Sequence, residues 1–180
     1  TGKTCTTDIN IETSLSDDIG RVQLKNNEPI PTLSDALSLV AGRVALNIEV
    51  KSDGSGALTA AHIAGSGYRG EVLISSFKER EVLDAKRVLP HVPAAGIFDD
   101  FAISDVSAYE KTGCSFISLR KKTVTRKLVA ALHDRGIKVY VWTVDEEAEM
   151  KKLVTWGVDG IYSNKPGVLK HAVERAFHDR

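Results

Sequence analysis

Short apolar runs alternate with longer amphipathic stretches from about residue 45 onward. Runs rich in Val, Ile, Leu and Phe predict buried strands at residues 45–50, 72–77, 94–98, 116–119, 139–144 and 160–162. Between and after them, apolar positions repeat every three or four residues, which predicts helices at residues 58–64, 79–88, 103–111, 126–135, 146–156 and 166–177. Gly113, Gly136 and Gly157 suit helix ends, and Pro166 suits a first helical turn.

The repeating strand and helix order predicts an α/β protein with a parallel sheet, since each interval leaves room for a helical crossover. An open doubly wound sheet and a (β/α)8 barrel both fit this order. The chain has no Gly-x-Gly-x-x-Gly turn for a dinucleotide, and its predicted strands are short and evenly spaced, which favours the barrel. Only six strands are predicted, however, and such a barrel has eight.

The first part of the chain has a different character. Residues 1–29 are polar without a sustained period, which predicts mostly loop. Thr32 then suits a helix N-cap, and Leu33, Leu37 and Val40 follow at helical spacing, so we expect a helix that ends near Gly42. At 180 residues the chain is long enough to bury a core, and we expect residues 1–180 to form one domain.

The predicted strand at 45–50 contains one charged residue, and a second follows directly after it, where apolar residues are expected. Asn47, Glu49 and Lys51 share one parity, so they project from one face, and the apolar residues between them project from the other. Charged groups at the carboxyl end of a parallel strand are typical of a ligand site. The alternative is the end of an edge strand that faces water. Residues 52–56, rich in Ser and Gly, predict a flexible loop after it.

Composition excludes several function classes. Lys plus Arg and Asp plus Glu both number 24, and no basic tract is dense enough to follow a nucleic-acid backbone. No stretch approaches the roughly 20 apolar residues of a membrane span, and the polar start is unlike a signal peptide. Cys5 and Cys114 lack the spacing of a metal or redox site. They are read as reduced thiols of a cytoplasmic protein, with a disulfide between them left open.

Five segments of the chain, in this order, resemble the ordered motifs of glycerophosphodiester phosphodiesterases: Ile30-Pro31-Thr32-Leu33, Leu46-Asn47-Ile48-Glu49-Val50-Lys51, Leu73-Ile74-Ser75-Ser76-Phe77, Val139-Tyr140-Val141-Trp142-Thr143-Val144 and Gly157-Val158-Asp159-Gly160-Ile161-Tyr162-Ser163-Asn164-Lys165-Pro166. Each motif alone is weak evidence, but five in the family's order are specific. The resemblance covers residues 30 to 170 or so.

The resemblance implies a TIM (β/α)8 barrel of the phospholipase C-like phosphodiesterase type. The Ile-Glu-x-Lys motif lies on the third strand in this family, so the six predicted strands correspond to the third to the eighth. Strands one and two, with their His-Arg-Gly and Glu-x-Asp motifs and a second catalytic His, are missing from this sequence. An incomplete barrel exposes two strand edges, so we expect residues 1–180 alone to form a homo-oligomer or to be poorly soluble or unstable.

Three residues carry the site that the resemblance implies. Glu49 matches one of three carboxylates that hold a divalent metal, Mg²⁺ or Ca²⁺, and is assigned a catalytic role with Lys51. Lys51 matches the family's phosphate-contacting lysine and is therefore also a substrate-binding residue. Trp142 matches a tryptophan that lines the glycerol side of the pocket. The alternative, which has equal weight, is that Trp142 only fills the core. Asn164 stands where the family often has Asp.

The implied function is that of a metal-dependent hydrolase of lipid and glycerol metabolism. It would convert a glycerophosphodiester, a small-molecule substrate, to glycerol 3-phosphate and an alcohol. Because two of the three carboxylates and both histidines are missing, we expect residues 1–180 alone to be inactive. The alternative is a non-catalytic barrel fragment or pseudoenzyme that acts as a structural or binding module. A different phosphate-handling barrel is a third possibility, against which the lack of a Gly-rich run near the last strands counts.

Overall fold

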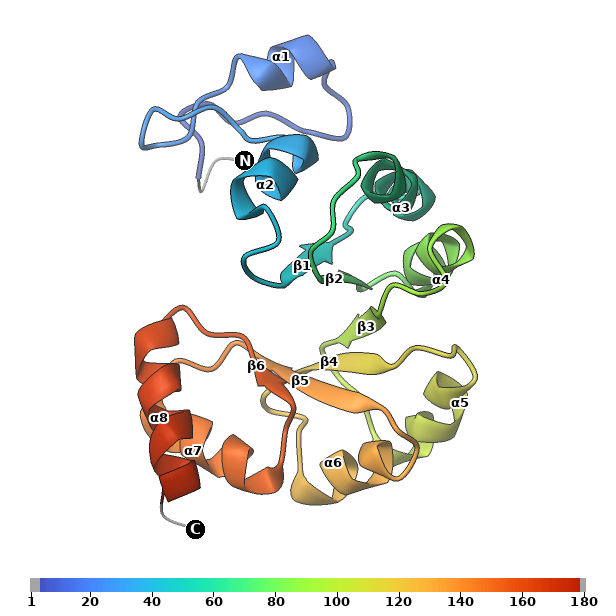
Figure 1. Cartoon of the computed structure of the whole chain (residues 1–180), viewed down its shortest axis with the longest axis vertical. Helices are drawn as coiled ribbons and strands as arrows, with labels where there is room; N and C mark the ends of the chain where they lie inside the picture. The colour runs from blue at the N-terminus through green and yellow to red at the C-terminus, as the bar shows by residue number, and fades with distance from the viewer. Residues whose placement is uncertain (1–3, 179–180) are drawn as a thin grey trace. The chain divides into compact units, whose positions relative to one another are not determined.

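The computed structural model describes residues 4–178, which contain one parallel six-stranded sheet (Figure 1). Its strands are β1 (Leu46–Glu49), β2 (Val72–Ser76), β3 (Ala94–Phe98), β4 (Phe116–Arg120), β5 (Lys138–Trp142) and β6 (Gly160–Ile161). Each strand pairs with the next one in the sequence, so the spatial order is β1-β2-β3-β4-β5-β6. A doubly wound sheet reverses its strand order at a switch point. The sequential order here is that of a (β/α) barrel, of which the six strands form an arc.

Helices connect the successive strands and follow the last one. They are α3 (Ser55–Gly65), α4 (Glu79–Val88), the 3₁₀-helix η1 (Ile103–Asp105) with α5 (Val106–Glu110), α6 (Arg126–His133), α7 (Glu147–Trp156) and α8 (Pro166–His178). This alternation gives each parallel pair the crossover that it needs. The predicted fold class, a partial TIM barrel, is therefore confirmed.

The predicted elements are all present, with differences at their ends. The strand expected at 139–144 is shifted to Lys138–Trp142, and the helix expected at 103–111 divides into η1 and α5. Helix α3 begins at Ser55 rather than at residue 58. Its first residues, Ser55 and Gly56, carry no apolar signal, so hydrophobic periodicity alone places its start too late.

The chain divides into two compact units, and the first contains residues up to Ala45 together with Ile63–Glu71. Residues 4–29 of this unit hold one short helix, α1 (Ser16–Gly20), and two isolated bridges, Cys5 to Leu24 and Gln23 to Pro29. Thr32 is the N-cap of helix α2 (Leu33–Val40), as predicted. The Thr32 hydroxyl accepts from the Asp35 N–H, and the Asp35 carboxylate accepts from the Thr32 N–H, which forms a capping box.

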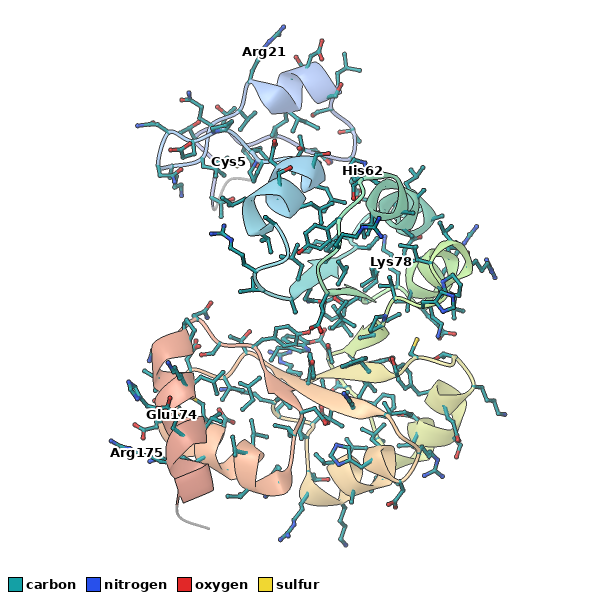
Figure 2. All side chains as sticks on the ribbon, in the orientation of Figure 1. Cys5, Arg21, His62, Lys78, Glu174 and Arg175 are labelled. Atoms are coloured by element: carbon teal, nitrogen blue, oxygen red, sulfur yellow. The ribbon has the colours of Figure 1, made fainter. Side chains whose placement is uncertain are left out.

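The second unit contains Leu46–His62 and residues from Val72 onward, and it holds the sheet and the main core. Fully buried side chains from the strands meet buried side chains from the helices: Ile117, Leu119, Val139, Val141, Leu128, Leu132, Met150 and Leu153. Helix α8 contributes Ala172 to this cluster, whereas its Glu174 and Arg175 extend away from it into solvent (Figure 2). The polar and apolar faces of the amphipathic helices thus determine which side packs on the sheet.

Two expectations about composition can be compared with the structure. Within residues 4–178, no helix combines the length and the apolar character that crossing a bilayer would require. Cys5 and Cys114 are both buried, and each is a free thiol in the structure.

Leu132 tests the core of the second unit. It is fully buried on α6, so Leu132→Ala should lower the free energy of unfolding by about 2–5 kcal/mol through lost burial and a residual cavity. Leu58→Ala is the matched control, because Leu58 is 71% exposed. Chemical denaturation of both variants measures the difference, and equal losses would contradict this account of the core.

Candidate functional site

Polar and aromatic side chains from several strands line a cavity of about 290 Å³ in the second unit. The lining includes Asn47 and Glu49 from β1, Ile97 from β3, Ser118 from β4, Trp142 from β5, and Tyr162 just after β6. Most of these residues lie in the later half or beyond the end of their strands. The cavity is therefore at the carboxyl edge of the sheet, where ligands bind in parallel α/β folds.

Glu49 and Lys51 lie together at the end of β1. Glu49 is the last residue of the strand and lines the cavity, and the Lys51 ammonium is 3.8 Å from its Oε1 atom. The side chain of Lys51 is 75% exposed and that of Glu49 is 35% exposed. An ion pair this long and this exposed contributes little to stability. Both charged groups are therefore free to exchange this contact for a ligand.

The sequence alternative for this strand was an edge position facing water. β1 is indeed an edge strand of the sheet that residues 4–178 form. Asn47 and Glu49, however, share the face that lines the cavity, as their parity predicted. The charged face of β1 is therefore turned toward a concave site as well as toward solvent.

Hydroxyl groups line or support part of the cavity wall. The Ser75 hydroxyl, on β2, donates to Oδ1 of Asn47 at 2.9 Å. The hydroxyls of Ser118 and Tyr162 are 3.3 Å apart, and Ser118 is only 1% exposed. Sequence reasoning did not select Ser118 or Tyr162. The available signal was a serine between Ile117 and Leu119 in an otherwise apolar strand, which suggests that one face of β4 is polar.

Trp142 is the aromatic residue that the sequence selected, and the structure places it in the cavity wall. Its ring meets that of Phe77 edge to face, with 5.7 Å between centroids. Its indole Nε1 is buried and donates to no atom of the described protein. Trp142 is half-buried and does not belong to the core cluster, and a buried donor without an acceptor is costly.

Burial alters the acid–base behaviour of one cavity residue. Removal from water raises the pKa of Tyr162, and the nearby Tyr140 and Glu49 raise it further, while the hydrogen bond with Ser118 lowers it. The phenol of Tyr162 therefore stays protonated at neutral pH. It offers a hydrogen-bond donor at the cavity wall, not a negative charge.

The cavity contains too few carboxylates to hold a divalent cation by itself. Glu49 is the one acidic residue in its lining, and no group of three or more His, Cys, Asp or Glu residues comes together within residues 4–178. The amide oxygen of Asn47 already accepts from Ser75. Because Mg²⁺ and Ca²⁺ take about six or more oxygen ligands, Glu49 fits such a site as one member of a larger set.

The fold and the cavity place this protein in the class of (β/α) barrels with a polar ligand site. In the described arc of the barrel, that site has a carboxylate, an ammonium and hydroxyls at the carboxyl edge. Comparison with known proteins is more specific. Residues 6–168 match the model of the glycerophosphoryl diester phosphodiesterase family. The chain belongs to this family, and its recognition from five short motifs is confirmed. The family is one of phosphoric diester hydrolases that generally depend on a divalent metal.

Individual relatives are distant in sequence. A glycerophosphodiester phosphodiesterase of Caldanaerobacter subterraneus is 26% identical over 82% of this chain and 63% of its own length. One from Bacillus altitudinis is 29% identical over 76% of this chain and 60% of its own length. This chain thus spans less than two thirds of these curated relatives.

Solved structures support the fold. An Oleispira antarctica phosphodiesterase in complex with its product sn-glycerol-3-phosphate superposes with a TM-score of 0.86 at 20% identity. The superposition covers 97% of this chain and 76% of the other. At this identity the likeness establishes the barrel architecture and leaves the roles of individual residues to experiment.

The hydroxyl pair of Ser118 and Tyr162 gives a test of the cavity wall. At a pH of about 10, where an ordinary tyrosine is half ionised, Tyr162 should remain mostly protonated. Ser118→Ala removes a hydrogen bond that lowers the pKa, so it should raise the pKa of Tyr162 further. NMR titration of the tyrosine ring carbons, assigned with Tyr162→Phe, measures both effects.

The same raised pKa affects stability in a defined direction. The folded state favours the neutral phenol of Tyr162. Its contribution to the free energy of unfolding is therefore complete below the pKa of the unfolded state, about 10, and is lost as the pH rises through the higher pKa of the folded state. The alkaline loss of stability should be smaller in Tyr162→Phe. If Tyr162 instead had the pKa of a free tyrosine side chain, such as that of N-acetyltyrosinamide, the described cavity wall would be contradicted.

Proposed function

We propose that this chain supplies strands three to eight of a glycerophosphodiester phosphodiesterase barrel. The native protein would hydrolyse a small glycerophosphodiester to glycerol 3-phosphate and an alcohol, with Mg²⁺ or Ca²⁺ as cofactor. The observation that carries the proposal is the placement of Glu49 in the cavity lining at the end of β1, with the Lys51 ammonium 3.8 Å from its carboxylate. Membership of the family and the barrel fold support it.

Each charged residue has a role that suits this chemistry. Glu49 would be a catalytic residue and one ligand of the cation, which when bound would neutralise charge on the phosphoryl oxygens. Lys51 would be both catalytic and substrate-binding, because its exposed ammonium can contact a phosphate oxygen and stabilise developing negative charge. Removal of either side chain should therefore affect the transition state more than the fold.

Trp142 would bind the glycerol part of the substrate. Its ring offers an apolar surface to the carbon atoms, and its buried Nε1–H lacks an acceptor in the protein. A substrate hydroxyl or phosphate oxygen would supply that acceptor. Because the cost of the unsatisfied donor would be relieved on binding, this N–H would favour a ligand with oxygen at this position.

The incomplete set of ligands favours a second candidate function. Residues 4–178 bring no three His, Cys, Asp or Glu side chains together, and Glu49 is the one acidic residue of the cavity. The remaining carboxylates and the histidine acid and base of the family's reaction would have to come from outside these residues. Without them, the chain would be a non-catalytic barrel module, and residues 1–180 alone are expected to be inactive.

The two edge strands of the sheet favour association between copies of the chain. β1 and β6 each have one neighbouring strand in the described sheet, and a free strand edge can pair with another chain. We therefore propose that the isolated chain self-associates as a homo-oligomer.

The two free cysteines agree with a reducing compartment, and the cytoplasm is the compartment that we propose.

Substitution of Glu49 tests the enzymatic proposal. Glu49→Gln in the native protein should lower release of sn-glycerol 3-phosphate from glycerophosphocholine by more than about a hundredfold, since even outer partners of metal ligands are worth 10- to 100-fold. The release is measured with Mg²⁺ or Ca²⁺ present. Glu79→Gln is the matched control, because Glu79 is exposed on α4 and outside this cavity. Unchanged release in Glu49→Gln, or none in the wild type, would reject the enzymatic role.

Trp142 offers a binding test that does not need turnover. Titration with sn-glycerol 3-phosphate should change the tryptophan fluorescence of the wild type and of Trp156→Phe, in which Trp142 is the remaining indole. The change should disappear in Trp142→Phe, because Trp156 lies on α7 and does not line the cavity. A response that persists in Trp142→Phe would place the ligand elsewhere.

A further inference from the structure

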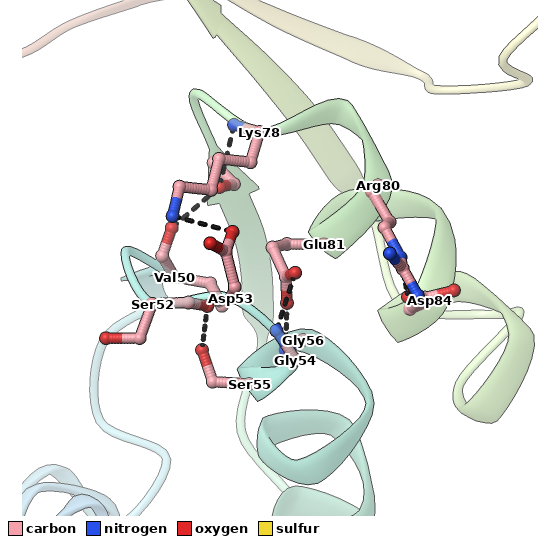
Figure 3. Close-up of polar contacts among 11 residues, drawn as sticks. Val50, Ser52, Asp53, Gly54, Ser55, Gly56, Lys78, Arg80, Glu81 and Asp84 are labelled. Atoms are coloured by element: carbon pink, nitrogen blue, oxygen red, sulfur yellow. Dashed lines mark hydrogen bonds and ion pairs between the residues drawn. The ribbon is translucent and has the colours of Figure 1, made fainter. Parts of the chain in front are cut away.

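The loop between β1 and α3, together with the first residues of α3, is held at several points by β2 and the start of α4. This segment, residues 50–56, follows Glu49 and contains Lys51, and Figure 3 shows polar contacts that hold it. Residues 52–56 were predicted to be flexible because they are rich in Ser and Gly. The structure shows instead a loop whose backbone groups have specific partners.

Glu81 makes the central contact. It lies in the first turn of α4, and its side chain is only 1% exposed. Oε1 accepts from the N–H of Gly54 at 2.8 Å, and Oε2 accepts from the N–H of Gly56 at 2.7 Å (Figure 3). A buried carboxylate is costly unless it is hydrogen-bonded, and here each of its two oxygens has a backbone donor.

The loop also approaches the backbone of α4 very closely. A Cβ atom built on Gly56 would lie 2.1 Å from the carbonyl oxygen of Glu81, a distance that no side chain tolerates. Glycine at residue 56 therefore permits the approach that brings the two N–H groups to the carboxylate. Gly56 therefore serves close packing, whereas Gly54 has a φ of +74°, a left-handed conformation that glycine adopts without strain.

Two further contacts hold the loop on either side of Lys51. Before it, the buried Ser76 hydroxyl donates to the carbonyl of Val50 at 2.6 Å. After it, the Lys78 ammonium pairs with Asp53 at 2.7 Å, on the exposed side of the loop. Lys51 thus lies between anchored residues, although its own side chain is exposed and contacts Glu49 at 3.8 Å.

We propose that Glu81 is a positioning residue for the phosphodiesterase site: it clamps the loop after β1 and thereby holds Lys51 beside Glu49, which lines the cavity. The buried carboxylate, its two backbone donors and the close approach at Gly56 carry this proposal. It rests on the proposed function for the identity of the ligand. The clamp itself is a property of the loop and can be tested without turnover.

Amide hydrogen exchange of the 180-residue chain tests the clamp. In Glu81→Gln, the amide oxygen keeps one neutral hydrogen bond and the amide NH2 faces the other N–H, so one bond is lost and the remaining one loses its charge assistance. Exchange at Gly54 and Gly56 should accelerate by about tenfold or more, while amides in β4 and β5 keep their wild-type rates. Glu79→Gln is the matched control, because it removes an exposed charge from the same helical turn.

The pH dependence of amide protection provides a second measurement of the clamp. The bonds to Gly54 and Gly56 hold the pKa of Glu81 below its usual value; burial and the charge of Asp53 on the loop raise it, and Arg80 on α4 lowers it. The clamp should therefore persist as the pH falls through the ordinary Glu range of about 4.3 and open at lower pH, where the carboxylate gains a proton. Protection at Gly54 and Gly56, corrected for intrinsic exchange, should lose this dependence in Glu81→Gln.

Titration with sn-glycerol 3-phosphate then tests the positioning role. The amide signals of Lys51 and Ser52 should shift in the wild type, and the apparent dissociation constant should rise by about tenfold in Glu81→Gln, because only the clamped fraction of the loop is competent to bind. Glu79→Gln should bind like the wild type.

The possible outcomes separate the clamp from the proposed function. Uniformly faster exchange across the chain, or unchanged exchange at Gly54 and Gly56, would overturn the clamp. Faster amide exchange at Gly54 and Gly56 in Glu81→Gln, together with an unaltered affinity for sn-glycerol 3-phosphate, would overturn the positioning role. Absence of any response of the wild type to sn-glycerol 3-phosphate would count against the proposed function, while the exchange pattern would still decide whether Glu81 holds the loop.

Discussion

Parallel pairing of successive strands is the constraint on which the rest of the structure depends. When all strands run the same way, their carboxyl ends lie along one edge, and each helical crossover returns the chain to the opposite edge. Glu49, Ser118 and Trp142 are far apart in sequence, yet this topology brings them to one cavity. The site therefore follows from the direction of the strands before any particular side chain is considered.

The two faces of the strands divide the work between folding and chemistry. Residues such as Ile117 and Leu119 pack with the helices, whereas Ser118, between them, faces the cavity. β1 has the same division, with Glu49 on the cavity side. This alternation allows a polar site to be built on strands whose other face is fully apolar, at no loss to the core.

A charged site at a strand end also needs a rigid support. The loop after β1 receives this support from Glu81, a residue of the next helix in the chain, through the backbone of Gly54 and Gly56. The contact is between adjacent β/α units, so it does not require the whole barrel. It explains how the exposed Lys51 can belong to a loop with a defined conformation.

The sequence by itself determined the alternation of strands and helices, the cap at Thr32, the family, and the shared parity of Asn47 and Glu49, because periodicity and short motifs are local properties of the chain. It did not reveal the partnership of Glu81 with Gly54 and Gly56, or the pairing of Ser118 with Tyr162. Those contacts join residues 25 to 44 positions apart. Only the packing of neighbouring units decides them, since the side chains involved have no local pattern that distinguishes a buried partner from a solvated surface residue.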